Sequence, residues 1–221
     1  MPSTLSTILD ELRATGAKLV AVSKTHPPEE LMPLYLEGQR DFGENRIQEM
    51  ATKRELMPKD IRWHAIGHLQ TNKVKFIAPF VHLIHSVDSL KLLQEIDRQA
   101  EKAGRVIPCL LQMHIAKEET KFGLDREELF SLLHAPEFAD LKHVEIRGLM
   151  GMATLTEDRE LIRSEFRMMS VLLEELQFGF FSGKESFCEL SMGMSSDYKI
   201  ALEEGSTLVR IGSLLFGPRQ N

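Results

Sequence analysis

The stretch KLVAVSKTH, residues 18–26, joins an apolar run to a lysine at the point where the run ends. Leu19 to Val22 are apolar and partly β-branched, which predicts a buried strand. Side chains alternate along a strand, so Lys24 lies on the same side as Val20 and Val22. If the two valines point into a closed sheet, the lysine points into its open end. The fold therefore decides what this lysine can do.

Strand-like runs alternate with amphipathic helical segments along the whole chain. The helical segments have recognisable boundaries: PPEELMPLYLEG begins at prolines and ends at Gly38, and DSLKLLQEIDRQAEKAG begins at Asp88 or Ser89 and ends at Gly104. A third, EDRELIRSEFRMMSVLLEEL, carries an apolar stripe at helical spacing that must pack on a sheet. Eight strand candidates occur, at residues 19–23, 41–44, 62–67, 82–87, 106–115, 145–153, 187–194 and 208–217.

Eight strands separated by helices predict a single α/β domain, a parallel (β/α)8 TIM barrel over residues 1–221. A doubly wound open sheet is the structural alternative. It is disfavoured because the strand count is eight and no glycine fingerprint follows the first strand. The chain has no linker-like composition break, and the last strand candidate ends close to Asn221, so we expect no second domain.

The composition is that of a globular protein, with 43% hydrophobic and 27% charged residues. The net charge of −6 and the scattered basic residues give no footprint for nucleic acid. No apolar run approaches a membrane span, and the first residues show no secretory pattern, so we expect a cytoplasmic protein with no membrane partner. Cys109 and Cys188 both lie in apolar segments and are interpreted as reduced core residues.

Polar residues follow the strand candidates at their C-terminal ends, where barrel enzymes build their sites. Partial burial at the mouth would disfavour the ammonium form of Lys24, and a neutral amine is what attacks a carbonyl to form an imine. A lysine that simply reaches out into water fits this strand equally well. The remaining strand ends must decide between the two.

The segment from Glu189 to Arg219 supplies the groups of an anion site. Hydroxyls and backbone amides lie at a helix start directly after strand seven, and a cation, a glycine and another hydroxyl end strand eight. Barrels often bind phosphate in the loops after these two strands. The residues concerned are Ser195, Ser196, Asp197, Arg210, Gly212 and Ser213.

A phosphate site and an imine-forming lysine on one rim indicate a ligand with both a phosphate and an aldehyde. Pyridoxal 5′-phosphate fits this description, because a lysine Schiff base with a phosphate cradle is its recurring binding scheme. A class I aldolase acting on a phosphorylated sugar would use the same two elements.

Several ordered motifs resemble the pyridoxal phosphate homeostasis protein family, which is related to the N-terminal barrel of alanine racemase. They are LVAVSKTHP (19–27), FGENRIQE (42–49), WHAIGHLQTNK (63–73), IHSVDS (84–89), GLMGMAT (148–154), LSMGMSSDY (190–198) and STLVRIGSLLFGPR (206–219). The resemblance covers nearly the whole chain. It implies a PLP-binding barrel of the kind called fold type III.

What the resemblance implies about the site can be stated residue by residue. Lys24 forms a reversible Schiff base with pyridoxal phosphate, and Asn45 lies beside the cofactor. The Ser195–Ser196 segment and the Gly212–Ser213 pair hold the phosphate. Arg210 is the neighbour of the pyridine nitrogen, and because arginine stays protonated it keeps that nitrogen unprotonated and weakens the cofactor as an electron sink.

The resemblance implies a carrier that buffers or delivers pyridoxal phosphate within the cell, with little or no catalysis and with PLP-dependent enzymes as possible clients. A PLP-dependent amino acid racemase or lyase is the alternative function. Alanine racemase brings a catalytic base from a further β domain, for which this chain has no room. An aldolase without bound cofactor is a third hypothesis, and the match at both the lysine and the phosphate segments argues against it.

Other polar residues are interpreted as structural. His64 and His68 have a spacing that suits zinc only on a helix, so no metal site is predicted. His82, His85 and His114 are expected as hydrogen-bonded core or rim residues. Met150, Met152, Met192 and Met194 fill the interior, or else form an apolar pocket wall. The segment 68–75, HLQTNKVK, is expected as a capped helix start, with a bordering effector site as the alternative.

Overall fold

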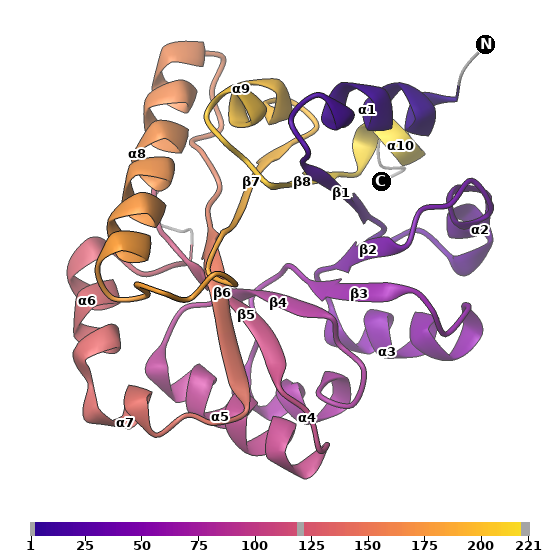
Figure 1. Ribbon diagram of the computed structural model, residues 1–221. Coiled ribbons are helices and arrows are strands. Elements are labelled where there is room, and N and C mark those ends of the chain that lie inside the picture. The colour runs from indigo at the N-terminus through magenta and orange to yellow at the C-terminus, as the bar shows by residue number, and fades with distance from the viewer. Residues whose placement is uncertain (1–2, 119–121, 218–221) are drawn as a thin grey trace.

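The computed structural model describes residues 3–118 and 122–217. Its eight parallel strands pair in sequence order and β8 returns to β1, which closes the barrel (Figure 1). This confirms the (β/α)8 prediction and excludes the open sheet. The strands are β1 Lys18–Val22, β2 Asp41–Glu44, β3 Arg62–Ala65, β4 Leu83–Val87, β5 Ile107–Gln112, β6 Val144–Met150, β7 Glu189–Met194 and β8 Leu208–Ile211.

Helices cover the outside of the barrel, and Figure 1 shows them as a ring around the strands. They are α1 Thr4–Arg13, α2 Pro28–Leu36, α3 Ile47–Leu56, η1 Thr71–Lys73, α4 Val74–Ile77, α5 Leu90–Lys102, α6 Arg126–His134, α7 Pro136–Ala139, α8 Arg159–Phe178, α9 Tyr198–Glu203 and α10 Ser213–Phe216. None of the helices within the described ranges combines the length and the apolar character that a membrane crossing needs.

The predicted helix boundaries arise from local capping. Ser89 accepts a hydrogen bond from the Leu92 amide at the start of α5, and Gly104 takes a positive φ of 64° just beyond its end. Asp158 caps α8 by accepting from the amides of Glu160 and Leu161. The boundaries predicted for α5 are thus confirmed, and the Asp158 cap adds a boundary for α8 that its apolar stripe alone does not predict.

The strand predicted at 208–217 is too long. The structure ends β8 at Ile211 and begins α10 at Ser213, so residues 213–216 are helical. The segment is apolar throughout, and a short apolar run does not distinguish strand from helix by its period. The correction matters for the site, because it places a helix start immediately after Gly212.

Three clusters of buried apolar side chains hold the barrel, two between the strands and the helices and one inside the barrel. The larger of the two outer clusters contains the largest fully buried side chains, including Trp63, Phe42 and Phe166. The inner core is small and consists of Val20, Leu83, Leu110, Met150 and Leu208. Polar side chains fill the rest of the barrel interior, and they connect its charged N-terminal end to its C-terminal mouth.

Candidate functional site

A cavity of about 640 Å³ opens at the C-terminal mouth of the barrel. Its walls come from the ends of β1, β2, β3, β5, β6, β7 and β8 and from the segments that follow them. Seven residues named from the sequence for this site line the cavity: Lys24, Asn45, Ser195, Ser196, Arg210, Gly212 and Ser213. Asp197, named with them, is not among the lining residues and instead accepts from the Met194 amide.

Lys24 reaches the cavity by the alternation that the sequence predicts. Val22 and Lys24 both line it, while Ser23 between them is fully buried on the opposite side and donates to Glu44 at 2.6 Å. Lys24 itself is partly buried. The lysine therefore faces a partly enclosed space and does not simply extend into water.

The loops after β7 and β8, the two strands that follow one another beside β1 in the closed barrel, are joined by hydrogen bonds. The Gly212 amide donates to Ser195 Oγ at 3.3 Å, and the Met194 amide donates to Asp197 Oδ1 at 2.6 Å. A side chain at position 212 would approach the Val22 carbonyl oxygen to 3.1 Å, so glycine allows β8 to lie close against β1. Hydroxyls of Ser195, Ser196 and Ser213 and the starts of α9 and α10 collect here, as an anion cradle requires.

Asn45 lies on the neighbouring wall beside Gly67. A Cβ at position 67 would come within 2.6 Å of the Asn45 carbonyl oxygen, so the glycine allows the ends of β2 and β3 to approach. Next to it His68 stacks on Phe122 with ring centroids 3.9 Å apart and pairs with Asp88 at 3.2 Å. The sequence did not single out Phe122 or Gln112, which also line the cavity.

The methionines near the mouth divide between the two roles considered for them. Met152 and Met194 line the cavity, and Met150 and Met192 are fully buried in the core.

The two cysteines differ in exposure. Cys109 is buried on β5, as expected, but Cys188 is exposed, so the prediction of a core position for it is wrong. It precedes the first residue of β7, where the chain is still at the surface.

Arg210 is buried at the bottom of the cavity and retains its charge at neutral pH. Its Nη1 donates to Ser191 Oγ at 2.6 Å and its Nη2 donates to the Gly151 carbonyl at 3.0 Å. Burial lowers the pKa of the guanidinium to about 10, an effect that the Asp197 carboxylate opposes. The protein thus fixes a cation at the inner end of the site.

A line of hydrogen bonds continues from Arg210 through the barrel interior. Ser191 Oγ lies 2.9 Å from His85 Nδ1, His85 Nε2 lies 2.9 Å from His64 Nδ1, and His64 Nε2 lies 3.0 Å from Asp41 Oδ1. These contacts confirm the expectation that His85 is a hydrogen-bonded core residue, and they place His64 in the same line. Sequence reasoning missed their connection because Ser191 is 106 positions from His85.

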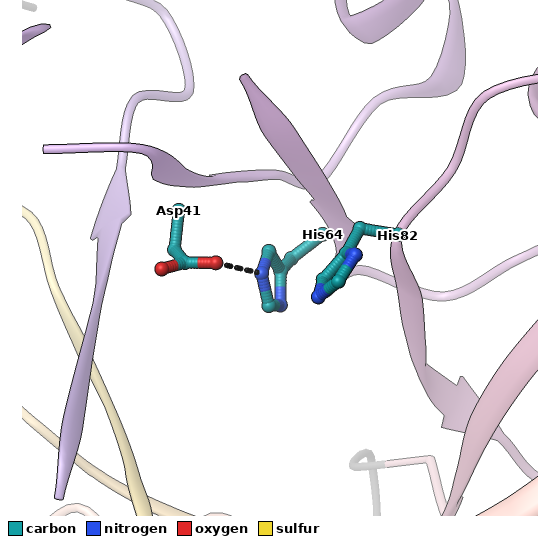
Figure 2. A group of neighbouring side chains, drawn as sticks. All are labelled: Asp41, His64 and His82. Atoms are coloured by element: carbon teal, nitrogen blue, oxygen red, sulfur yellow. Dashed lines mark hydrogen bonds and ion pairs between the residues drawn. The ribbon is translucent and has the colours of Figure 1, made fainter. Parts of the chain in front are cut away.

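Asp41, His64 and His82 form a group whose ligand atoms all lie within 4.8 Å of one another. Figure 2 shows the hydrogen bond between Asp41 and His64, with the His82 ring beside the His64 ring. Arg62 already binds both Asp41 oxygens, at 2.6 and 2.5 Å, so a metal cation would have to compete with a guanidinium. The group therefore serves as the charged end of the interior hydrogen-bond line.

His64 and His68, which the sequence places on a strand and in the loop after it, have different surroundings. His64 belongs to the barrel interior with Asp41, whereas His68 lines the cavity at the mouth.

His85 is fully buried, and its pKa is lowered well below the usual value by burial and by the neighbouring His64, Arg210 and His82. Asp41 has its pKa lowered too, because the hydrogen bonds from Arg62 and His64 outweigh the opposing effect of burial.

Residues 4–220 match the family model described as alanine racemase, N-terminal domain. The chain is 43% identical over 205 residues to the pyridoxal phosphate homeostasis protein of Aquifex aeolicus, covering 92% of this chain and 88% of that protein.

Solved structures of PipY from Synechococcus elongatus superpose with a TM-score of 0.86 without PLP and 0.84 with PLP bound. Their sequence identities to this chain are 38% and 37%. The two comparisons cover 95% and 96% of this chain, and 98% and 100% of the PipY chains. An alanine racemase from Clostridium difficile shares the fold, with a TM-score of 0.70 at 15% identity over 99% of this chain and 57% of that one.

Proposed function

Because the chain belongs to the pyridoxal phosphate homeostasis protein family, we propose that it binds pyridoxal 5′-phosphate reversibly and covalently through Lys24. In this role it buffers or delivers the cofactor and catalyses little or nothing. One observation carries the proposal. Lys24, which follows β1, lines the same cavity as the residues of the proposed phosphate site, which follow β7 and β8.

The residues fit the cofactor in kind and in placement. The Ser195, Ser196 and Ser213 hydroxyls and the amide side of Gly212 hold the phosphate, while Asn45 lies on the wall beside β3. The Lys24 amine adds to the aldehyde carbon, and one water leaves as the carbon–nitrogen double bond forms. The same water, added back, releases the free aldehyde, so the linkage is suited to a carrier.

Arg210 favours the carrier over the racemase or lyase alternative. Bound pyridoxal phosphate supplies an electron sink for carbanions, and the sink is strong when its ring nitrogen is protonated. A guanidinium that stays charged at neutral pH donates hydrogen bonds and cannot supply that proton at low cost. With Arg210 beside the ring nitrogen, carbanion chemistry is weak.

We place this role in the cytoplasm, where both cysteines, which are free, would remain reduced. Recipients of the cofactor would be apo forms of PLP-dependent enzymes. One barrel domain over residues 1–221 is sufficient for binding and release, because every residue of the proposed site comes from strand ends of the same barrel.

Titration of the purified protein with pyridoxal phosphate, followed by absorption spectroscopy, tests the linkage. The wild type is expected to develop the visible band of a protein-bound Schiff base, and Lys24→Ala is expected to lose it while remaining folded. Lys18→Ala is the matched control, since Lys18 is an exposed lysine on the same strand. A band that survives in Lys24→Ala, or no band in the wild type, refutes the proposal.

Incubation of the loaded protein with a panel of L- and D-amino acids separates carrier from enzyme. The carrier is expected to racemise or cleave none of them at an ordinary enzymatic rate. Turnover on the order of 1 per second or faster would establish the racemase or lyase alternative instead.

A further inference from the structure

The two peptide groups that flank Lys24 are both held by one charged cluster outside the barrel. On one side Lys53 Nζ donates to the Ser23 carbonyl oxygen at 2.7 Å. On the other side the Thr25 amide donates to Glu49 Oε1 at 2.7 Å. Lys53 and Glu49 bind each other at 2.7 Å, so one ion pair spans the backbone on both sides of the lysine.

The cluster is charged, with Lys53 and Glu44 buried and the Glu49 side chain 22% exposed. Lys53 Nζ also donates to Glu44 Oε1 at 2.6 Å, and the side chains of Lys53 and Glu44 are 4% and 0% exposed. Burial raises the pKa of Glu44, against the opposing effects of Lys53 and Ser23. Buried charges of this kind are costly to desolvate and packing alone does not require them. Their hydrogen bonds here end on the backbone around Lys24 and on the neighbouring Ser23 hydroxyl.

Thr25 has a φ of 69°, and it is the one non-glycine residue with a positive φ among residues 3–118 and 122–217. This left-handed conformation is a true outlier for a β-branched residue. It persists only where the surroundings impose it. The Thr25 amide donates to the Glu49 carboxylate, and the His26 amide closes the same turn by donating to the Ser23 carbonyl oxygen at 3.1 Å.

Resting on the proposed function, we propose that Glu49 and Lys53 are positioning residues that hold the Lys24–Thr25 turn in its strained form and thereby aim the Lys24 amine into the cavity. Neither residue lines the cavity. They act through the backbone: Lys53 holds the carbonyl before Lys24, and Glu49 holds the amide after it. Without this clamp Thr25 relaxes to an ordinary φ, and the turn that carries Lys24 changes direction.

If Glu49 holds the turn, substitutions at position 49 should act according to whether they leave a hydrogen-bond acceptor for the Thr25 amide. Glu49→Ala removes the acceptor and is expected to slow the capture of pyridoxal phosphate by Lys24 by about tenfold to a hundredfold, because misplacement of a reacting group has costs of this size. Glu49→Gln keeps an oxygen acceptor and is expected to stay within about threefold of the wild type. The double variant Thr25→Gly/Glu49→Ala is expected to recover much of the rate, because glycine adopts a positive φ without strain.

Capture is measured by borohydride quenching at timed intervals and by mass spectrometry of the Lys24 peptide. Lys18 on the same strand is the internal reference. Reductive methylation with formaldehyde is the second arm, since this small reagent needs no orientation by the cavity. Glu49→Ala is expected to lower pyridoxal phosphate capture at Lys24 and leave its methylation unchanged or faster.

The possible outcomes are distinct. If the wild type captures no pyridoxal phosphate, the proposed function fails, and the inference that rests on it falls too. If the wild type captures it and Glu49→Ala does so at the same rate, the clamp is refuted while the function stands. Parallel loss of both reactions, or no recovery in the double variant, also contradicts positioning, because either result indicates a general collapse of the turn.

Discussion

Two basic side chains, Lys24 and Arg210, line the cavity, and their neighbours give them different roles. Lys24 is partly buried on a turn, at the end of a strand, where it lines the same cavity as Ser195, Ser196 and Ser213. Arg210 is buried and fixed by Ser191 and the Gly151 carbonyl. One side chain is placed to react and the other to remain a fixed charge. The two roles are distinguished by burial and hydrogen bonding. The sequence pattern alone does not distinguish them, because both residues lie at the ends of strands.

The hydrogen bonds behind Arg210 can run in only one direction if both histidines are neutral. An ionised Asp41 can only accept, so His64 Nε2 must carry the proton and His64 Nδ1 must accept from His85 Nε2. His85 Nδ1 then accepts the Ser191 hydroxyl proton, and the Ser191 oxygen accepts from Arg210. The ion pair at one end of the barrel thus orients the hydroxyl that holds the arginine at the other.

Nitrogen-15 NMR of histidine side chains tests this direction. His85 is expected as a neutral ring protonated on Nε2 at pH 7, with His64 Nδ1 accepting its hydrogen bond. Substitution Ser191→Ala is expected to free His85 Nδ1 of its partner and change its nitrogen shift, while leaving the His64–Asp41 contact in place. An Nδ1-protonated ring at either position in the wild type would contradict the one-way arrangement.

The sequence predicted the cavity residues well and the interior line hardly at all. Lys24, Asn45 and Arg210 could be found because a residue at the end of a parallel strand must lie on the same rim as the others. The contact of His85 with Ser191 depends on register and bulges, including the shift between Ile84 and Val87, which no local pattern encodes. The Thr25 strain likewise depends on Glu49, a residue of another element.

At the scale of elements, the short α9 and α10 bring two loops to the site, while long helices supply stability. The strand predicted to run through 212–217 hid the start of α10, because Leu214, Leu215 and Phe216 are apolar in either conformation. Helix α8 was predictable over nearly its whole length, since its apolar stripe and its Asp158 cap are both local signals. Its buried face packs on β6 and β7.

Substitutions on the two faces of α8 should differ sharply in their effect. Phe166 is fully buried, and Phe166→Ala is expected to lower the free energy of unfolding by about 3–5 kcal/mol, from lost burial and from the cavity left behind. Val171 on the same helix is 57% exposed, and Val171→Ala is expected to change the free energy of unfolding by less than about 0.5 kcal/mol. Urea denaturation measures both. Similar losses for the two variants would contradict the packing described.

The whole molecule is a barrel with a charged end and a binding end, joined by a polar interior. Asp41 with Arg62, and Glu145 with Arg147, lie at the N-terminal end, whereas the cavity opens at the other. The apolar inner core is small because histidine, serine and arginine side chains occupy part of the interior. This arrangement makes the stability of the protein sensitive to mild acid.

The sign of that pH dependence follows from two histidines. Burial lowers the pKa of His85 well below its usual value and that of His82 to about 4. Between about pH 6.5 and 4 the unfolded chain therefore binds more protons than the folded one. The free energy of unfolding is expected to fall as the pH is lowered from 7 towards 5, by up to about 1.4 kcal/mol per pH unit for each histidine.

Denaturation curves at pH 7, 6 and 5 measure this slope. His85→Gln is expected to reduce the slope of the free energy of unfolding against pH by up to about 1.4 kcal/mol per pH unit, the contribution of one histidine. This holds whatever the stability of the variant at pH 7. The exposed His134 on α6 provides the control substitution, His134→Gln. Equal slopes in the wild type and His85→Gln would contradict this prediction, because they would show that His85 has the same pKa in the folded and the unfolded chain.

The most direct measurement of the central claim is borohydride reduction of the protein loaded with pyridoxal phosphate, followed by peptide mapping. One pyridoxyl group per chain is expected, on the peptide that contains Lys24. A group on another lysine, or none on any, would contradict the assignment of the cavity at the barrel mouth as a covalent cofactor site.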